Sequence, residues 1–382
     1  MLRRLSFPLG LVLLSGVTPL AAQSGAFVAR LGKDTLAVEK FTRTPARLEG
    51  EMANRVGRVT IRHYVFEFNS AGAPTRGEMT FFRPDSMNRP VQRVVLQFSG
   101  DSVFSEVTRD TAVTRRRVGI PHGTTPLPLG PYAAWELVTS RAMRASADSA
   151  GYMGYGAGGQ GSMELSAWKL GRDSVAWSTP WDVYHARVDR DGRILGSIPQ
   201  GGTTQFALER LADVDVRGIA ARWQRSEQPA QNVLSLSPRD TIRASVGGAQ
   251  LTIDYGRPSK RGRTVFGDVV PWGTVWRTGA NAATQIRTDK TLELGGVLLP
   301  AGFYTLWTIP TPSGWSLVVN GETGQWGTEH KDDRDLFRLP MQVTSLPQPV
   351  ETFTIGVTPS GQGGTLSLEW DTTRASIPFT VR

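Results

Sequence analysis

The chain has 382 residues, no cysteine and a formal net charge of +9, and 39% of its residues are hydrophobic. This length predicts two or three domains of roughly 100–200 residues each, and the composition excludes a disordered or fibrous chain. The lack of cysteine excludes a disulfide framework, a thiolate nucleophile and a cysteine-ligated metal. Basic residues are dispersed apart from residues 115–117, so we expect no nucleic-acid partner.

The first 22 residues have the layout of a secretory signal peptide. Arg3 and Arg4 form a positive segment, residues 5–14 are apolar, and the small residues Ala21 and Ala22 follow. The apolar segment is too short for a membrane-spanning helix, which needs about 20 residues. We therefore expect a soluble periplasmic or secreted protein, with no transmembrane segment after cleavage. Without cysteine it cannot be a lipoprotein.

Residues 24–225 predict an antiparallel sheet with one helix. Apolar residues alternate in residues 58–69, and turn residues at 99–102 separate two more alternating stretches, which is typical of paired strands. Residues 131–149 begin with a proline and carry apolar residues at helical spacing, which predicts the helix. Residues 214–223 fit either a last strand or a short helix. We identify no known family in this region.

Residues 226–238 form a polar stretch that includes Pro229, which predicts a linker. Residues 239–382 then predict about nine short strands with almost no helical period. The glycine pairs at 247–248 and 295–296 are typical of tight hairpins, and residues 303–309 are apolar on both faces, as expected between two layers. This pattern predicts a β-sandwich of jelly-roll type.

Six motifs in residues 236–380 follow one another in a specific order. They cover residues 251–258, 275–284, 299–310, 325–328, 351–355 and 366–370. Together they resemble the bacterial domain-of-unknown-function family 2911. Two positions depart from that pattern: Gly256 stands where a serine is usual, and Glu329 and His330 replace a more usual aromatic residue. The resemblance implies an exported all-β protein, often with an unrelated extra domain, and it implies no reaction.

The candidate ligand-binding residues lie in this C-terminal part. Residues 271–281 are too rich in Gly and Pro for a strand, and they concentrate Trp272, Trp276, Arg277 and Asn281. Such a loop can place aromatic faces and fixed donors around a small polar ligand. In the structural alternative, Trp276 fills the core while Arg277 and Asn281 bond to turn carbonyls. Neighbouring motifs complete the candidate set with Arg257, Trp326 and His330.

Two classes of function remain open. We favour a non-catalytic exported binding or envelope-associated module that uses no cofactor and binds a small polar ligand or an envelope component. The alternative is a secreted hydrolase of a polar substrate, for example a carbohydrate, that uses His330 and nearby carboxylates. Such an enzyme should bring Glu329 or an aspartate within about 5–10 Å of a second carboxylate or histidine in a cleft.

The acidic residues after position 328 also invite comparison with a calcium site. Glu329, Asp332, Asp333 and Asp335 lack a calcium-binding frame, and Lys331 and Arg334 interrupt them. We therefore expect a solvated turn or the start of a helix there, and no metal.

Overall fold

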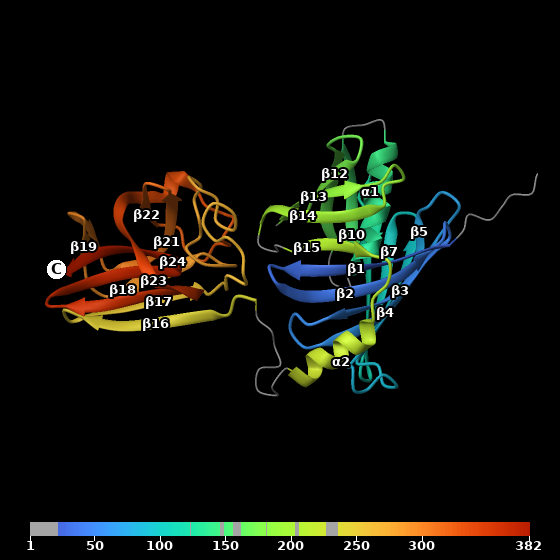
Figure 1. The fold of residues 1–382 in the computed structure, drawn as a ribbon, viewed down its shortest axis with the longest axis horizontal. Helices are drawn as coiled ribbons and strands as arrows, with labels where there is room; N and C mark the ends of the chain where they lie inside the picture. The colour runs from blue at the N-terminus through green and yellow to red at the C-terminus, as the bar shows by residue number, and fades with distance from the viewer. Residues whose placement is uncertain are drawn as a thin grey trace, which may run out of the picture.

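The computed structural model describes residues 22–122, 124–145, 149–155, 162–180, 182–202, 206–226 and 236–382. Residues 1–21 of the predicted signal peptide and residues 227–235 of the predicted linker lie outside these ranges. The described chain is mainly β and forms two large sheets, one on each side of the predicted linker (Figure 1). We call residues 22–226 the N-terminal region and residues 236–382 the C-terminal region. No helix within the described ranges is both long and apolar enough to cross a bilayer.

The N-terminal sheet has 15 strands in the order β8-β7-β6-β5-β4-β3-β2-β1-β15-β14-β13-β12-β11-β10-β9. Neighbouring strands are antiparallel, as predicted, except that β9 pairs with β10 in parallel. The strands are β1 (Gln23–Leu31), β2 (Asp34–Arg43), β3 (Arg47–Asn54), β4 (Thr60–Phe68), β5 (Pro74–Phe82), β6 (Gln92–Ser99), β7 (Ser102–Arg109), β8 (Ala112–Gly119), β9 (Thr125–Pro128), β10 (Ser149–Tyr155), β11 (Ser162–Lys169), β12 (Ser174–Ser178), β13 (Asp182–Val188), β14 (Ile194–Gly202) and β15 (Ala207–Leu211).

The main core of the N-terminal region lies between this sheet and one helix. The 3₁₀ helix η1 (Tyr132–Ala134) leads into α1 (Trp135–Arg144), which confirms the helix predicted after Pro131. Val138 of α1 packs with Tyr64 and Phe66 of β4 and with residues of the strands at the other end of the sheet. The sheet therefore folds over α1, because both of its halves share one apolar face.

A second helix, α2 (Val216–Ser226), corrects the prediction of one helix in this region. Val216, Ala220 and Trp223 are spaced four and three residues apart and pack against the outer face of strands β1 to β4. The Asp215 carboxylate accepts a 2.9 Å hydrogen bond from the Gly218 N–H and so caps the first turn. The sequence was compatible with a strand or a helix at residues 214–223 because this segment is short. The helix forms because only a helix can present all three apolar side chains to the outer face of strands β1 to β4.

A buried carboxylate fixes the start of α1. Glu39 of β2 is fully buried and accepts a hydrogen bond from the Tyr64 hydroxyl. It also accepts the backbone N–H groups of Tyr132 at 2.7 Å and Ala133 at 3.2 Å, which η1 leaves without helical partners. Burial raises the pKa of Glu39 to about 7, because these hydrogen bonds and the positive charge of Arg62 offset only part of the cost of desolvation.

A second buried carboxylate joins α1 to β14 and β15, in the middle of the sheet order. Glu136 accepts a 3.0 Å hydrogen bond from the Ile194 N–H and forms an ion pair with Arg210. Burial raises the pKa of Glu136, although the positive charges of Arg210 and Arg43 oppose the shift. The two carboxylates thus anchor one helix to strands that are far apart in the chain.

The C-terminal sheet has nine strands in the order β16-β17-β18-β21-β22-β23-β24-β19-β20. The hairpins predicted at Gly247-Gly248 and Gly295-Gly296 are confirmed, and all four glycines have positive φ. The last two strands are longer than predicted, at 26 and 19 residues, and irregular pairing interrupts their middle. The strands are β16 (Arg239–Val246), β17 (Ala249–Gly256), β18 (Thr284–Thr288), β19 (Leu292–Leu294), β20 (Val297–Leu299), β21 (Gly302–Thr311), β22 (Gly314–Asn320), β23 (Asp335–Ser360) and β24 (Gly363–Val381).

Strand β21 has apolar residues on both faces, but they do not all become buried. Leu306 packs in the main core of the C-terminal region, whereas Trp307 lies in a smaller cluster with Ala283 and Val318. Phe303 remains 52% exposed near the start of the strand. The apolar pattern of residues 303–309 therefore predicted burial on two faces correctly for the centre of the strand and wrongly for its first residues.

Candidate functional site

A cleft of about 960 Å³ lies between the two regions. Its N-terminal wall comes from the β1–β2 turn, the end of β3, and strands β14 and β15. Its C-terminal wall comes mainly from residues 258–281, the irregular segment between β17 and β18, together with Gly327 and Trp370. Both sheets therefore contribute side chains to one concave surface.

Close backbone packing shapes the segment between β17 and β18. The backbone of Trp276 exchanges hydrogen bonds of 2.7 and 2.9 Å with Thr308 of β21. The segment also lies directly on β17, because a Cβ at Gly256 would come within 2.1 Å of the Ala280 carbonyl oxygen. Gly279 has a φ of +157° and has Gly256 as its neighbour. Backbone contacts thus fix this segment on either side of Arg277, at Trp276 and at residues 279–280, and so fix the position of Arg277.

Three arginines line the cleft, against Asp268 as the one acidic residue among its described lining residues. Arg263 donates hydrogen bonds to the backbone carbonyls of Ser259 at 2.9 Å and Lys260 at 3.1 Å. Carbonyl acceptors orient a guanidinium without removing its charge. The cleft therefore has a positive balance.

The other two arginines reach the cleft from opposite regions. Arg277 donates a 3.4 Å hydrogen bond to the Gly327 carbonyl, and its Cδ occupies the place where a Cβ of residue 327 would lie. Arg30 of β1 donates to the Thr35 hydroxyl at 2.9 Å and lies 3.5 Å from the Glu209 carboxylate, and its side chain is 43% exposed. Arg277 is thus a half-buried guanidinium on the C-terminal wall, and Arg30 is a more exposed one on the N-terminal wall.

Burial affects the pKa values of the two arginines on the C-terminal wall. It lowers the pKa of Arg277, and the negative charge of Asp182, a residue of the N-terminal region, opposes this shift. It also lowers the pKa of Arg263, which the positive charge of Arg261 lowers further. A guanidinium starts from so high a pKa that both side chains stay charged at neutral pH. Both side chains therefore contribute positive charge to the C-terminal wall.

Aromatic side chains form the apolar part of the C-terminal wall. Trp276 is buried in the core and stacks on Trp370, with ring centroids 6.0 Å apart and planes 18° apart. Its indole N–H donates to the Gly279 carbonyl at 3.1 Å, so the polar edge of the ring is satisfied. Trp276 therefore packs in the core, as the structural alternative described, and it also forms part of the cleft lining.

Direct contacts join the two walls at one end of the cleft. The Lys33 N–H donates to the Arg261 carbonyl at 2.9 Å, and Arg261 forms an ion pair with Asp34. Gly32, in the same β1–β2 turn, has a φ of +58°, and a Cβ there would lie 2.2 Å from the Arg261 carbonyl oxygen. Only glycine permits this approach, so the junction depends on the identity of residue 32.

Three of the seven predicted ligand-binding residues line the cleft, namely Trp276, Arg277 and Asn281. Asn281 has a φ of +62°, and its carbonyl accepts a 2.9 Å hydrogen bond from the Gly327 N–H. This backbone contact ties Asn281 to the segment after β22, and it differs from the bond to a turn carbonyl that the structural alternative described.

The other four predicted residues lie elsewhere in the C-terminal region. Arg257 bonds to the Phe353 carbonyl, the Asp240 carboxylate and the Thr354 hydroxyl at 3.1–3.2 Å, which ties β16 to β23. Trp272 is 41% exposed and stacks on Phe266, and Trp326 is 37% exposed.

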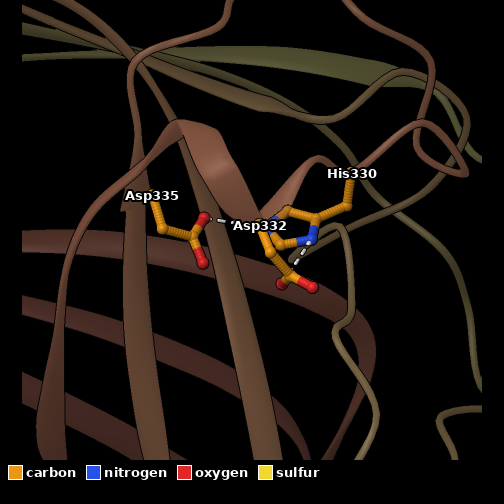
Figure 2. A group of neighbouring side chains, drawn as sticks. All are labelled: His330, Asp332 and Asp335. Atoms are coloured by element: carbon orange, nitrogen blue, oxygen red, sulfur yellow. Dashed lines mark hydrogen bonds and ion pairs between the residues drawn. The ribbon is translucent and has the colours of Figure 1, made fainter.

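His330 meets two aspartates at the start of β23, as Figure 2 shows. Its Nε2 lies 2.9 Å from Asp335 and its Nδ1 lies 3.5 Å from Asp332. The three side chains could offer ligand atoms within 4.8 Å of one another. However, Arg338 donates to both carboxylates, and Asn320 donates to Asp335. A guanidinium already neutralises the charge that a cation would need, so the geometry fits an internal ion-pair network.

The pKa of Asp335 is consistent with that network. Burial raises the pKa of Asp335, but hydrogen bonds from Asn320, Arg338 and His330 outweigh it, and the pKa lies below its usual value. The 3₁₀ helix η3 (Asp332–Arg334) occupies the position where the acidic run predicted a turn or the start of a helix.

Sequence reasoning missed the N-terminal wall of the cleft. Arg30, Val56, Ile198 and Phe206 line it, and each lies in or beside an ordinary strand. No local pattern distinguishes them from other strand residues. Arg263 follows one of the family motifs and Trp370 ends another, so attention to motif ends would have found these two.

Residues 237–379 match the family described as Protein of unknown function (DUF2911), which confirms the resemblance predicted from the six motifs. No family matches the N-terminal region. No curated protein matches the chain.

Two solved structures are similar to part of the chain, and both are of proteins of unknown function. One is a beta-barrel-like protein of DUF1849 from Brucella abortus, with 11% identity and a TM-score of 0.34 over 50% of this chain and 93% of that one. The other is a DUF1089 family protein from Pseudomonas aeruginosa, with 12% identity and a TM-score of 0.28 over 50% of this chain and 95% of that one. Likeness at this level carries no argument about function.

Proposed function

We propose that the protein is a non-catalytic binding module that holds a small anionic ligand with an apolar part in the cleft between its two regions. The observation that carries this proposal is the charge balance of the cleft, where three arginines face one aspartate among the described lining residues. A guanidinium presents a fixed fork of donors that matches a carboxylate or a phosphate.

The remaining lining supports a ligand that also has an apolar part. Val56 and Ile198 contribute from the N-terminal region, and Trp276 and Trp370 from the C-terminal region. Small-molecule sites typically combine such apolar walls with a few fixed polar groups, and volumes of about 300–1,000 Å³ are usual for them. The cleft volume lies within this range, so the site suits a ligand of metabolite size.

The same cleft gives no support to the hydrolase alternative. General acid–base hydrolysis needs two groups that exchange protons near the scissile bond. The described lining residues include one carboxylate, Asp268, and no histidine. His330 does meet two aspartates, but Arg338 and Asn320 already bond to these carboxylates. Binding is therefore the function that the geometry favours.

A matched set of three probes tests the proposal. We would titrate the full mature chain with 4-phenylbutyrate, its neutral amide and 4-phenylbutylamine, and follow tryptophan fluorescence, because Trp276 and Trp370 line the cleft. The carboxylate should bind more tightly than the amide, and the amine should bind least. Equal binding of the three probes would contradict a site selected by positive charge.

A pair of arginine variants assigns the binding to the cleft. Arg30→Gln removes a charge from the exposed edge of the cleft and should weaken binding of the carboxylate by several-fold, because an exposed charge pair is worth about 0.2–1 kcal/mol. Arg287→Gln is the matched control, since Arg287 is exposed on β18 and is not among the cleft residues. An equal effect of both variants would indicate non-specific electrostatics.

The sandwich arrangement of the C-terminal region is part of this proposal. Its core combines residues of β17, β22, β23 and β24, which lie on different parts of the sheet order. Such burial between distant strands is expected when a sheet folds over itself as in a jelly-roll. In this view residues 239–382 form one β-sandwich and residues 24–225 a separate β-rich unit, with residues 226–238 as the linker.

We propose further that the protein is exported. The positive, apolar and small-residue segments of residues 1–22 support cleavage close to Ala22. N-terminal sequencing of protein from the periplasmic or extracellular fraction should then begin near Gln23 or Ser24. Recovery of chains that retain Met1 would contradict this assignment.

A further inference from the structure

Strand β8 ends the N-terminal sheet and leaves one of its edges free. It is the outermost strand of the sheet order, and among the described strands it pairs only with β7. Each of its residues from Ala112 to Arg117 is exposed. An unpaired edge offers a row of backbone N–H and C=O groups to another strand.

The hairpin register shows which residues present these groups. Asp110 and Thr111 form a two-residue turn, with a φ of +51° at Asp110, and Arg109 pairs with Ala112 across it. In such hairpins the pair that closes the turn is hydrogen-bonded, and bonded and non-bonded pairs then alternate. The N–H and C=O groups of Val113, Arg115 and Arg117 therefore face the free edge.

The side chains beside this edge combine positive charge with an apolar surface. Arg115 and Arg117 lie opposite Glu106 and Phe104 of β7 and share one face of the sheet with them. Their side chains are 73% and 60% exposed, and the Arg117 guanidinium lies 5.1 Å from the centre of the Phe104 ring. Arg115 also forms an ion pair with Glu106 at 2.7 Å, and Arg117 forms one with Asp101 at 3.4 Å. Phe104 is itself 43% exposed.

A shallow cavity of about 500 Å³ lies at the same place, lined by Val95 and Phe104 together with the three arginines at 115–117. Arg116 pairs with Ser105 and points its side chain to the opposite face from Arg115 and Arg117. Arginines therefore flank the free edge on both faces, with Glu106 and Asp101 as partners of Arg115 and Arg117, and an apolar hollow adjoins one face.

We propose that this edge binds an extended acidic peptide segment of a partner protein, which adds to the sheet as a strand beside β8. Strand addition gains main-chain hydrogen bonds, and the side chains opposite the edge give specificity. Acidic residues directly opposite Arg115 and Arg117 would lie on the same face as these arginines, at the spacing of cross-strand pairs. This surface is separate from the cleft and does not depend on the proposed ligand.

A second copy of this chain is a poorer occupant of the same edge. If two β8 strands paired antiparallel about Arg116, Arg115 of each chain would lie opposite Arg117 of the other. Like charges directly opposite each other destabilise a strand pair. The arginine run thus disfavours self-association and favours a strand of opposite charge.

The direct test uses a short labelled peptide and the full chain. A capped hexapeptide that alternates Glu and Val should bind in a fluorescence anisotropy titration, and a peptide that alternates Lys and Val should not. N-methylation of the Glu residues removes the N–H groups that would face β8 and should abolish binding. N-methylation of the Val residues, whose N–H groups face away, should leave most of the binding intact.

Charge-reversal variants place the binding at β8. Arg115→Glu/Arg117→Glu should weaken the Glu-Val peptide at least about tenfold, since each reversal replaces an attraction with a repulsion. Arg243→Glu/Arg287→Glu makes the same change in net charge at two exposed positions of the C-terminal sheet and should have little effect. The β8 variant should also gain binding of the Lys-Val peptide, which a variant that failed to fold could not do.

Three results would overturn the proposal. Equal binding of the two N-methylated peptides would show that only charge attracts them, without strand addition. Equal loss of binding in both double variants would place the peptide elsewhere. Polygalacturonate binding at least as tightly as the Glu-Val peptide, and displacing it, would identify the edge as a surface for anionic polymers.

Discussion

Arg277 lies where the two regions meet, and its side chain has two environments. Its aliphatic part packs over Gly327, and its guanidinium reaches the Gly327 carbonyl through a long hydrogen bond of 3.4 Å. It is also the cleft arginine that senses the charge of Asp182 across the junction. We therefore expect Arg277 to contribute modestly to stability and directly to the binding of an anionic ligand.

Arg277→Ala should lower the free energy of unfolding by about 1–2 kcal/mol, because a buried carbonyl acceptor loses a donor and packing over Gly327 is lost. It should also remove most of the binding of 4-phenylbutyrate. Chemical denaturation and the fluorescence titration measure the two effects. Arg277→Lys keeps the charge and should retain more of the binding than Arg277→Ala. Unchanged binding in Arg277→Ala would tell against the cleft as the ligand site.

Glu39 predicts a pH dependence of stability whose sign follows from its pKa. The folded-state pKa, about 7, lies above the ordinary value of 4.5 for an exposed glutamate, so the folded protein binds the proton more tightly than the unfolded chain. The contribution of Glu39 to stability is therefore fully present below about pH 4.5 and is lost as the pH rises through 7. The loss amounts to about 3 kcal/mol on this basis.

Glu39→Gln should remove this dependence, because the amide stays neutral at every pH. Urea denaturation at pH 5.5 and pH 8 measures the free energy of unfolding of both proteins. The wild type should lose stability between these two values, and the variant should lose less. Glu136→Gln is a useful comparison, since burial also raises the pKa of Glu136 although two arginines oppose the shift. An identical pH dependence of wild type and Glu39→Gln would contradict the assignment.

At the scale of elements, turns decide how the two sheets meet. The β1–β2 turn contacts residues 261–263, and a Cβ at Gly32 would collide with the Arg261 carbonyl oxygen. The β4–β5 hairpin has a comparable glycine, Gly72, with a φ of +76° and no atom within 4 Å of a Cβ. A substitution would strain the positive φ at both positions, but only at Gly32 would it also disturb a contact across the junction.

Gly32→Ala should therefore speed hydrogen exchange of the Lys33 amide, which donates to Arg261 across the junction. Gly72→Ala should cost about 1 kcal/mol of stability from the strained φ alone and should leave that amide unchanged. Hydrogen exchange measured by NMR on both variants separates the two effects. Equal exchange rates at Lys33 would show that the junction tolerates a side chain at residue 32.

At the scale of the whole molecule, each region has its own buried core. The buried core residues of the C-terminal region all lie within residues 246–379, and those of the N-terminal region lie within residues 27–223. The contacts between the regions are few and polar by comparison, such as the Arg261–Asp34 ion pair. Stability of one region should then depend little on the other.

A fragment of residues 236–382 should unfold cooperatively on its own, with a circular dichroism spectrum dominated by β structure. At this length a single core is sufficient for independent folding. Loss of the N-terminal wall would uncover the cleft side of the C-terminal wall, so the fragment should be less soluble than the full chain. A fragment without a cooperative transition would show that the C-terminal core needs the N-terminal region.

Local patterns were sufficient for much of the secondary structure. The glycine pairs at 247–248 and 295–296 predicted their hairpins, and Pro131 with the apolar spacing after it predicted α1. Such signals succeed because turn and helix preferences act over a few residues. Residues 214–223 were ambiguous between strand and helix, since that choice depended on the outer face of a sheet formed elsewhere.

The sequence by itself determined the strand-rich composition, the family of residues 237–379 and a loop that concentrates Trp276, Arg277 and Asn281. Only the tertiary structure decided that this loop faces Arg30 and Ile198 of the other region, and that Arg257 and His330 bond within their own sheet instead. The physical reason is that propensity and alternation report interactions between neighbours in the chain. A cleft depends on contacts between residues far apart in the chain, which form only when two complete sheets meet.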